Sequence, residues 1–480
     1  MDKARKEYQM KIAFIHYHLK TGGVTTVIKH QIEAIRDTCD ALILTGALPK
    51  TLLPCDAVQI PGLGYDRPGR NTLNPLDVTA SIIQAIHSKW KDGCDLVHVH
   101  NPFLAKNKNF LKILKALQQK NIKLFLQIHD FAEDGRPLFY FSDDEYIADC
   151  HYGVINSRDY NILLKAGLKK NGVHKIFNTI KPFQYKSTDV STKKQVLYPV
   201  RAIRRKNIGE AILLSVFFKN HETLVITLPP NSPVDLKSYA GWKAFARENH
   251  LKVVFDAGMT REFSELVRSS AFLVTTSIAE GFGFSFLEPW IARKILWGRK
   301  LPDICHDFES RGIRLDHLYT RISVPLEWLD KESLSNTWQS CVRKACAMFD
   351  FPIREASIAN AFEKIIADET IDFGLLNEAL QKQIIARLLA DPRNPSRLIH
   401  LNPFLLSPGD VSDPETLIQN NRQAALRNYS PTIYANTLKD IYKKVGSLNV
   451  RQRIDKSALA SEFLNLENFS LLKWGPYVEA

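Results

Sequence analysis

Apolar extended runs alternate with helical patterns along the first 180 residues of the chain. Short runs of β-branched and aromatic residues predict strands, and apolar positions spaced three and four apart predict helices. The predicted strands are Ile12–His16, Ala41–Leu44, Leu96–His100, Lys123–His129, Gly153–Asn156 and Lys175–Asn178, and the predicted helices include Val24–Ile35 and Phe103–Gln118. Such alternation is typical of a parallel sheet covered by helices on both faces.

A polar, weakly patterned segment from Lys181 to Gln195 indicates a linker, and the alternation restarts after it. The second set of predicted elements comprises strands Val196–Val200, Thr223–Leu228, Lys252–Phe255 and Phe272–Ser277, with helices near Gly209–Phe218 and at Phe263–Ser269. A chain of 480 residues is also too long for one ordinary hydrophobic core. We therefore expect an α/β protein with two Rossmann-like, doubly wound domains at residues 1–185 and 186–445.

The last third of the chain has a different character. From about residue 326 to 400 the pattern is mainly helical, which indicates a helical insertion in the second domain. Further helices are predicted at Pro414–Asn428 and Ile433–Val445. The remaining tail, residues 446–480, contains an apolar stretch at Ser457–Leu472 that we expect to pack back on the body of the protein.

Charge and composition narrow the classes of partner. The net charge is +13, which suits nucleic acid, an anionic membrane surface or phosphorylated substrates. The basic residues are dispersed and lack aromatic residues among them, so we expect no nucleic-acid partner. Seven scattered cysteines without a C-x-x-C pair, no long apolar stretch and no signal peptide indicate a reduced, cytoplasmic protein. Peripheral contact with an anionic membrane stays open, although no clear basic amphipathic helix supports it.

The segment from Glu280 to Glu288 (EGFGFSFLE) is the most informative motif. An extended run ends just before it and an apolar, helix-like stretch follows, so the glycines lie in a strand–turn–helix that suits an anionic group. Carboxylates can accept hydrogen bonds from sugar hydroxyl groups. The alternative for Glu288 is a capping box with Ser285, and for Glu280 a solvated loop position.

A basic turn follows the strand that opens the second domain. The run Arg201 to Lys206 places several cations at the carboxyl end of that strand, where arginine offers forked hydrogen bonds to phosphate and lysine a point charge. The alternative is a solvated basic loop. In the first domain, Gly22 and Gly23 follow the first strand, where open parallel sheets bind ligands. They could equally form a plain strand-to-helix turn, and they do not make a G-x-G-x-x-G dinucleotide fingerprint.

Three histidines of the first domain are also candidates. His129 follows the extended run Lys123–Ile128 at its carboxyl end, and His98 and His100 share one face of the strand Leu96–His100. No third metal ligand is apparent beside them, and the chain contains no D-x-D pair. We therefore expect no metal and no other cofactor, with Arg and Lys side chains supplying the positive charge.

Taken together, these motifs resemble the retaining GT-B glycosyltransferases, specifically glycosyltransferase family 4 with its E-x7-E motif. The resemblance rests on Glu280–Glu288, Arg201–Lys206, Gly22–Gly23, Asp95–His100 and His129–Asp130, and it covers about residues 10–325. Pro199 and Val200 stand where the family has glycine. The segment after Glu288 and the insertion at about 326–400 match no motif of the family.

The resemblance implies two facing domains and a reaction that retains the anomeric configuration. It implies that the catalytic residues are Glu280, His129, Arg201 and Lys206. It also implies that the residues around the donor are Gly22, Gly23, Arg201, Lys206, Gly281, Phe282, Gly283 and Glu288. In this scheme Arg201 and Lys206 hold the donor diphosphate, Glu280 contacts the transferred sugar and Glu288 the ribose.

The function predicted from the sequence is thus sugar transfer from a nucleotide-sugar donor to an unknown, soluble hydroxyl acceptor. A GT-B sugar phosphorylase or sugar-phosphate synthase is the alternative within enzymes. A non-catalytic binding or scaffold protein is the alternative from another class. The base, the sugar, the acceptor and the oligomeric state are not determined by the sequence.

Overall fold

The computed structural model describes residues 9–49, 52–66, 73–182 and 194–477. The chain forms two units, and each takes two separate segments of the sequence: unit 1 contains Met1–Lys181 and Tyr429–Phe463, and unit 2 contains Pro182–Asn428 and Leu464–Ala480. The sequence-based division placed residues 429–445 in the second domain, whereas they pack with the first. The hydrophobic pattern gives each helix an apolar face but does not say which sheet that face covers.

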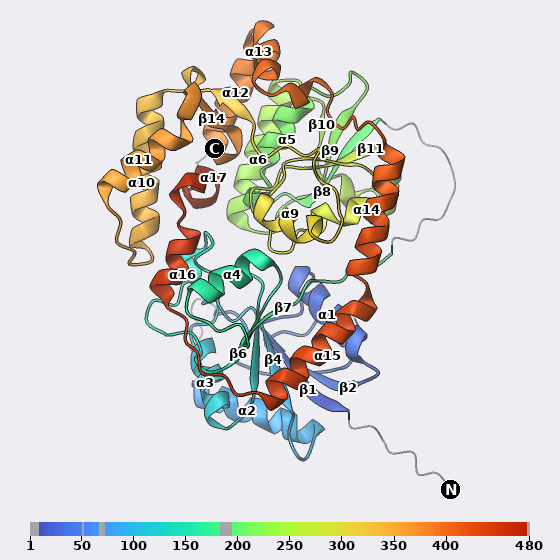
Figure 1. The fold of residues 1–480 in the computed structure, drawn as a ribbon, viewed down its shortest axis with the longest axis vertical. Coiled ribbons are helices and arrows are strands. Elements are labelled where there is room, and N and C mark those ends of the chain that lie inside the picture. Colours follow the sequence, from blue (N-terminus) through green and yellow to red (C-terminus); the bar gives the residue numbers. More distant parts are fainter. Residues whose placement is uncertain (1–8, 50–51, 67–72, 183–193, 478–480) are drawn as a thin grey trace. The chain divides into compact units, whose positions relative to one another are not determined.

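Unit 1 is built on a seven-stranded parallel sheet (Figure 1). Its strands are β1 (Met10–His16), β2 (Cys39–Thr45), β3 (Asp56–Gln59), β4 (Leu96–His100), β5 (Leu124–Ile128), β6 (His151–Val154) and β7 (Val173–Lys175). The order is β3-β2-β1-β4-β5-β6-β7, so the winding reverses between β1 and β4. Such a reversal point in an open α/β sheet is where ligands bind, outside the carboxyl ends of the strands.

Helices cover both faces of this sheet. The helices of unit 1 are α1 (Gly23–Ile35), α2 (Pro75–Lys89), α3 (Phe110–Gln119), α4 (Ser157–Lys165), α15 (Pro431–Ser447) and α16 (Lys456–Phe463). On one face α1 packs beside α15, whose Tyr434, Leu438 and Tyr442 join the core (Figure 1). On the other face, α2, α3 and α4 share a core with Leu459 and Phe463 of α16. The late segment 429–463 therefore completes both sides of unit 1.

Unit 2 contains a five-stranded parallel sheet. Its strands are β8 (Gln195–Arg201), β9 (Thr223–Leu228), β10 (Val253–Val254), β11 (Ser270–Thr275) and β12 (Leu296–Gly298). The order is β10-β9-β8-β11-β12, so the reversal point lies between β8 and β11. Its helices are α5 (Ile208–Ser215), α6 (Pro233–Glu248), α7 (Phe263–Ser269), α8 (Glu288–Ile291), α9 (Pro302–Glu309) and α14 (Pro414–Asn428).

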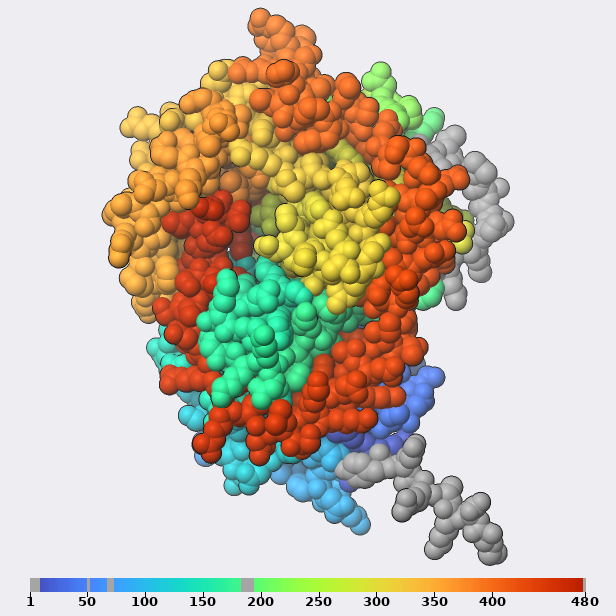
Figure 2. All heavy atoms as spheres, viewed as in Figure 1, coloured from blue at the N-terminus to red at the C-terminus, as the bar shows by residue number. Residues whose placement is uncertain are grey.

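The predicted helical insertion is present in unit 2. It contains α10 (Lys331–Ala347), α11 (Glu355–Ile365), α12 (Glu378–Ala390) and α13 (Arg393–Leu401), with a short antiparallel pair of strands, β13 (Ser323–Pro325) and β14 (Thr370–Asp372). The C-terminal segment returns to these helices through α17 (Leu471–Trp474). Trp338 of α10 donates its indole N–H to the Phe469 carbonyl at 3.1 Å. Figure 2 shows this dark red segment against the orange outer helices.

Most predicted elements occur in the structure, with shifted ends. The prediction of a helix at Phe103–Gln118 is wrong at its start, because α3 begins at Phe110 while Phe103 and Leu104 are buried in the preceding loop. Strand β3 was not among the predicted strands, and helices α2 and α4 lie between strands, where helices were expected without stated bounds. Most of the predicted linker, residues 183–193, lies outside the described residues, as do residues 478–480 of the tail.

None of the described helices is long and apolar enough to cross a membrane.

Candidate functional site

The reversal point of the unit 2 sheet brings together two residues that the sequence separates by 74 positions. Strand β8 leads into the 3₁₀ helix η2 (Arg204–Lys206), and β11 leads into the turn that carries Glu280. The Lys206 ammonium forms an ion pair with Glu280 Oε1. Their side chains are 16% and 8% exposed. The structure therefore brings the basic turn into direct contact with the acidic motif.

The charge state of Glu280 follows from this contact. Burial alone would raise the pKa of its carboxyl, but the charges of Lys206 and Arg205 and the hydrogen bond from Lys206 outweigh that effect and lower the pKa below its ordinary value. Glu280 is thus an ionised acceptor of hydrogen bonds at neutral pH. Lys206, its ion-pair partner, could bind a phosphate oxygen of a ligand in place of the Glu280 carboxylate.

Glu288 does not form the capping box that was one reading of its position. A 3₁₀ helix, η4 (Phe284–Phe286), precedes it, α8 begins at Glu288 itself, and no side chain among the described residues caps either helix. The Ser285 hydroxyl has no hydrogen-bond partner in the described part of the chain. Desolvation by the surrounding protein raises the pKa of Glu288 to about 7, with Lys206 opposing and Glu280 adding to the increase. The residue nevertheless keeps exposed surface that a ligand can reach.

The other basic residues of the turn have separate partners. Arg201 donates to the Pro229 carbonyl at 2.8 Å and to Asn231 Oδ1 at 2.6 Å. Arg204 is structural: its side chain is 9% exposed and makes a forked contact with Glu378 of α12, with both hydrogen bonds at 2.7 Å. The predicted phosphate cations Arg201 and Lys206 therefore remain candidates, while Arg204 ties the turn to the helical insertion.

Two of the predicted donor residues between the acids, Phe282 and Gly283, have structural roles of their own in the fold. Gly283 has φ +90°, and a Cβ there would lie 2.9 Å from Ile304 Cγ2. The Phe282 ring is 5% exposed and packs edge-on against Phe284 and Phe308. Any contact of Gly281–Gly283 with a donor would therefore involve the backbone, as the resemblance implies.

A shell of hydrogen bonds holds the Lys206 turn in place. Asn207 adopts a left-handed conformation with φ +49°, which asparagine tolerates better than most residues. Its carbonyl and that of Lys206 accept hydrogen bonds from the Thr276 hydroxyl at 2.9 and 3.1 Å. Tyr198 also donates to the Lys206 carbonyl, at 2.5 Å. The end of β11 thus fixes the backbone on which Lys206 stands.

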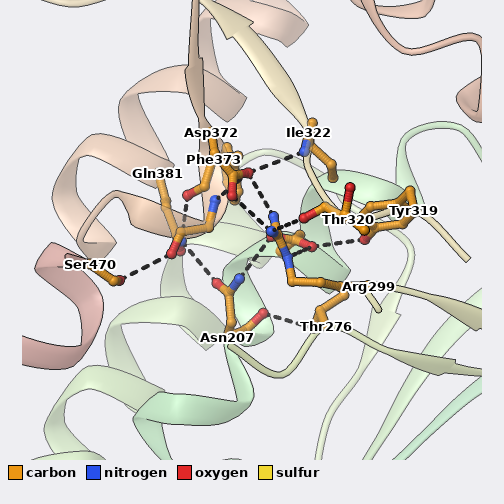
Figure 3. Close-up of polar contacts among 12 residues, drawn as sticks. Asn207, Thr276, Arg299, Tyr319, Thr320, Ile322, Asp372, Phe373, Gln381 and Ser470 are labelled. Atoms are coloured by element: carbon orange, nitrogen blue, oxygen red, sulfur yellow. Dashed lines mark hydrogen bonds and ion pairs between the residues drawn. The ribbon is translucent and has the colours of Figure 1, made fainter. Parts of the chain in front are cut away.

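Behind this turn lies a buried ion cluster that no sequence motif indicated (Figure 3). Arg299, 4% exposed, contacts Glu210 at 2.6 and 2.8 Å and Asp372 at 2.8 Å through two nitrogens. Glu210 accepts a further bond from Asn207 Nδ2 at 2.9 Å, and Gln381 of α12 donates to Asn207 Oδ1 at 2.9 Å. The residue that follows β12, the insertion and the Lys206 turn therefore meet in one network.

In unit 1 the predicted Gly22–Gly23 turn stands at the N-terminus of α1. Gly22 is extended, at φ 172°, and a Cβ on Gly23 would meet nothing within 4 Å, so the fold itself does not require glycine at either position. Among the described residues, no side chain caps α1 and its first turn holds no acid. Uncapped helix N–H groups attract anions, which is compatible with the donor contact that the resemblance implies for Gly22 and Gly23.

His129 belongs to a buried histidine cluster. Its Nε2 lies 2.9 Å from His100 Nδ1, and His98 Nδ1 lies 2.9 Å from the Tyr442 hydroxyl of α15. Burial lowers the pKa of His129 to about 4, with Asp130 opposing, so its imidazole is neutral at pH 7. His129 can therefore exchange hydrogen bonds but is a poor proton donor, and its catalytic role stays a prediction.

Within the described ranges, no group of three or more His, Cys, Asp or Glu side chains is arranged to hold a metal ion.

Comparison with known proteins yields one clear relative and a consistent fold. No family model matches the chain. Mannosylglucosyl-3-phosphoglycerate synthase of Petrotoga mobilis is 27% identical over 418 residues, which cover 77% of this chain and 79% of that protein. Among solved structures, HepE of Anabaena in complex with UDP and glucose is similar with a TM-score of 0.52 and 14% identity, over 91% of this chain and all of that one. Sucrose-phosphate synthase of Thermosynechococcus elongatus is similar with a TM-score of 0.53 and 14% identity, over 91% and 98%.

The chain has the GT-B fold of glycosyltransferases. The two parallel sheets of seven and five strands agree with the predicted fold class. The relative and the fold together support an enzyme of the glycosyltransferase type.

Proposed function

We propose that the protein is a retaining, metal-independent glycosyltransferase of the family 4 type. It transfers a sugar from a nucleotide-sugar donor to the hydroxyl group of an acceptor. The observation that carries the proposal is the Lys206–Glu280 ion pair at the reversal point of the unit 2 sheet. The pair offers one cation and one ionised carboxylate side by side, which suits a sugar joined to a phosphate.

Lys206 would neutralise the donor diphosphate and stabilise the charge that develops as it leaves. Electrostatic groups fixed where charge develops supply the largest share of many enzymes' rate enhancement. Arg201 would add a second cation, while Glu280 would accept hydrogen bonds from the transferred sugar. The charge of Lys206 acts on the pKa of Glu288, so the two side chains lie near one another. The Glu288 carboxylate would accept hydrogen bonds from the ribose hydroxyl groups.

In the proposed reaction the bond between the anomeric carbon and the phosphate oxygen breaks, and a bond to the acceptor oxygen forms on the same face. The acceptor proton passes to the departing phosphate oxygen. The chain therefore has no need of a carboxylate nucleophile, and Glu280 can remain ionised throughout. This agrees with a carboxyl whose pKa is lowered by adjacent cations.

The comparisons indicate which substrates to test first. The HepE structures contain UDP, glucose or UDP-glucose, and the Petrotoga relative is named for a mannosylated product that carries glycerate and phosphate. We propose a hexosyl donor, with mannosyl and glucosyl nucleotides as first candidates. If the acceptor carries a phosphate, the product of transfer is a sugar phosphate. The enzyme would then be both a glycosyltransferase and a sugar-phosphate synthase.

Two variants and one control test the site. Lys206→Ala and Glu280→Gln should each lower the transfer rate at least tenfold, the scale of losing one preorganised contact, with unchanged circular dichroism. Lys219→Ala is the matched control, because Lys219 pairs with Asp410 on the surface of the same unit, at 3.2 Å with both side chains more than half exposed. Normal transfer by either site variant would refute the assignment.

The alternatives predict different outcomes. A phosphorylase releases sugar phosphate and no free nucleotide, so detection of the nucleoside diphosphate as product excludes it. A scaffold protein would gain no thermal stability from nucleotide sugars, whereas a donor at 100 times its Kd adds about 2.7 kcal/mol. Full activity in excess EDTA is expected, and its loss with recovery on adding Mg²⁺ would contradict metal independence.

A further inference from the structure

The two ring nitrogens of His129 have different surroundings in unit 1. The residue follows β5, and its backbone N–H donates to Asn101 Oδ1 at 3.2 Å. Its Nε2 lies 2.9 Å from His100 Nδ1, whereas its Nδ1 has no hydrogen-bond partner in the described part of the chain. Whether Nδ1 carries the proton decides whether His129 offers a ligand a hydrogen-bond donor or an acceptor.

We propose that His100 is a positioning residue, which donates its Nδ1–H to His129 Nε2 and so holds the His129 proton on Nδ1. In this form His129 donates a hydrogen bond from Nδ1 to an oxygen of the bound substrate and keeps its proton during the reaction. The substrate contact rests on the proposed function. The position of the proton concerns unit 1 alone and does not depend on which sugar is transferred.

A glutamine on the neighbouring strand sets the direction of these hydrogen bonds. Gln127 of β5 lies opposite His100 of β4 in the parallel sheet, so both side chains leave the same face. Gln127 Oε1 lies 2.8 Å from Gln31 Nε2 of α1 and 3.0 Å from His98 Nε2. All four side chains are fully buried. The amide oxygen of Gln127 is therefore already engaged twice, and its N–H groups are left for another acceptor.

Two buried nitrogens of the opposed pair determine the tautomer of His100. Among the described residues, neither Gln127 Nε2 nor His100 Nε2 has a hydrogen-bond partner. An amide N–H₂ only donates, so a lone pair on His100 Nε2 suits the residue opposite, whereas a second N–H does not. A buried donor without an acceptor also costs more free energy than a typical hydrogen bond gains. The proton of His100 is therefore on Nδ1, which faces His129.

The hydrogen bonds then share one direction from α15 to His129. The Tyr442 hydroxyl of α15 donates to His98 Nδ1 at 2.9 Å, and His98 Nε2–H donates to Gln127 Oε1. At the other end, His100 Nδ1–H donates to His129 Nε2. Burial lowers the pKa of all three imidazoles, so each ring is neutral at pH 7 and has one proton. A neutral ring that accepts a hydrogen bond at Nε2 carries its proton on Nδ1.

The orientation of the rings supports this hydrogen bond. The His100 and His129 rings are nearly coplanar, with centroids 5.2 Å apart and planes 15° apart. This edge-to-edge arrangement directs an N–H along the ring plane towards the other nitrogen, as a well-aligned hydrogen bond requires. Asn101 Oδ1 also accepts the backbone N–H of Asp130 at 3.0 Å, which holds the chain on both sides of the His129 ring. A donor fixed in this way loses little freedom when a ligand binds.

The tautomer of His129 can be measured directly in the full chain. With nitrogen-15 labelled histidine, two-bond proton–nitrogen correlation spectra at pH 7 distinguish a ring protonated on Nδ1 from one protonated on Nε2. His129→Gln identifies the His129 signals among those of the 14 histidines by their disappearance. We expect the Nδ1–H form. A His129 ring protonated on Nε2 would overturn the inference, whether or not the protein is active.

Substitutions at His100 separate positioning from packing. His100→Leu removes the hydrogen bond, so the His129 proton should move at least partly to Nε2 and the transfer rate should fall about tenfold, the scale of one hydrogen bond. His100→Asn offers an amide N–H near the place of Nδ1 and should restore the tautomer and most of the rate. Parent-like tautomer and rate in His100→Leu would refute the positioning role.

A second histidine pair in the same sheet provides the control. His174 Nε2 lies 2.9 Å from His151 Nδ1 with ring centroids 5.2 Å apart, the same distances as in the His100–His129 pair. His174→Leu therefore removes an equivalent contact between buried imidazoles elsewhere in unit 1. We expect it to leave the His129 tautomer and the transfer rate unchanged. A change in either equal to that of His100→Leu would mean that general packing, not the His100 hydrogen bond, is responsible.

The outcomes separate this inference from the proposed function. The probes are the UDP, GDP and ADP derivatives of glucose and mannose. If His129 is in the Nδ1–H form but the protein neither binds nor hydrolyses any of these probes, the proposed function fails and the role of His100 stands. If the protein transfers sugar with His129 in the Nε2–H form, the inference fails and the proposed function stands. A full transfer rate in His129→Gln would overturn the substrate contact.

Discussion

Removal of the Arg299 charge tests whether the buried cluster behind the Lys206 turn is essential to unit 2. Arg299→Met keeps most of the side-chain length and deletes the guanidinium. Five hydrogen bonds are lost: two to Glu210, two to Asp372 and one to the Thr320 carbonyl at 3.0 Å. The two carboxylates then remain without their cation.

The magnitude follows from what stays behind. Glu210 is fully buried and keeps Tyr319 and Asn207 as donors, whereas Asp372 is 15% exposed and keeps two backbone N–H groups. Breaking a buried ion pair by removing one partner costs about 3–5 kcal/mol, mainly from the carboxylate left uncompensated. Asp372 contributes less to this cost, because it is partly exposed and keeps its hydrogen bonds from the backbone. We therefore expect the free energy of unfolding to fall by about 3–5 kcal/mol near pH 8.

Urea unfolding followed by tryptophan fluorescence measures this change. Six of the seven tryptophans belong to unit 2, and only Trp90 belongs to unit 1, so the signal reports mainly the unit that contains Arg299. Arg343→Met is the control, because Arg343 and Glu355 form an exposed pair at 2.7 Å with side chains 45% and 69% exposed. Exposed pairs contribute little, so this variant should unfold like the parent protein.

The pH dependence gives an independent check. Burial raises the pKa of Glu210, and Arg299 opposes that effect. Without Arg299 the folded protein binds a proton on Glu210 more readily than the unfolded chain does, so the stability of the variant should rise as pH falls from 8 towards 5. Arg299→Met/Glu210→Met should recover much of the loss. A single variant within about 1 kcal/mol of the parent protein at pH 8 would refute the reasoning.

Three further predictions concern the glycines and the acid of the candidate site. Gly23→Ala should leave the protein equally or more stable, by up to about 1 kcal/mol, yet weaken donor binding; an unchanged donor KM would remove Gly23 from the site. Gly283→Ala should lower the melting temperature, because of φ +90° and the contact with Ile304, whereas Gly446→Ala, with nothing within 4 Å, should not. The lowered pKa of Glu280 means that the stability from its ion pair is present above the ordinary carboxyl pKa and is lost as pH falls through the lowered value. Glu280→Gln should therefore reduce the loss of stability on acidification, and an unchanged acid limb would contradict the ion pair.

The helical insertion was predicted only in part. Apolar periodicity predicted its helices but not the contacts that they make with the Lys206 turn. In the structure Glu378 and Gln381 of α12 and Asp372 of β14 reach Arg204, Asn207 and Arg299, and so fix the turn on which Lys206 stands. These residues carry no motif, because hydrogen bonds between residues more than 70 positions apart leave no mark in local spacing.

The same limit applies to three of the four basic residues of the turn. Arg201, Arg204 and Lys206 look equivalent in sequence, as cations after a strand. Their roles differ because their surroundings differ: Arg204 meets a buried carboxylate from the insertion, Arg201 a carbonyl after β9, and Lys206 the acidic motif. Periodicity places a side chain at the end of a strand but does not reveal what faces it.

By itself, the sequence determined the α/β class, the restart of the alternation after the linker segment, the helical insertion and the acidic and basic motifs at strand ends. These depend on local periodicity and short-range spacing, which each segment carries alone. Only the tertiary structure decided that Tyr429–Phe463 completes unit 1, that Lys206 pairs with Glu280, and that His100 meets His129. Those features arise where strands that are distant in sequence end at one edge of a sheet, and sheet order is set by packing across the whole unit.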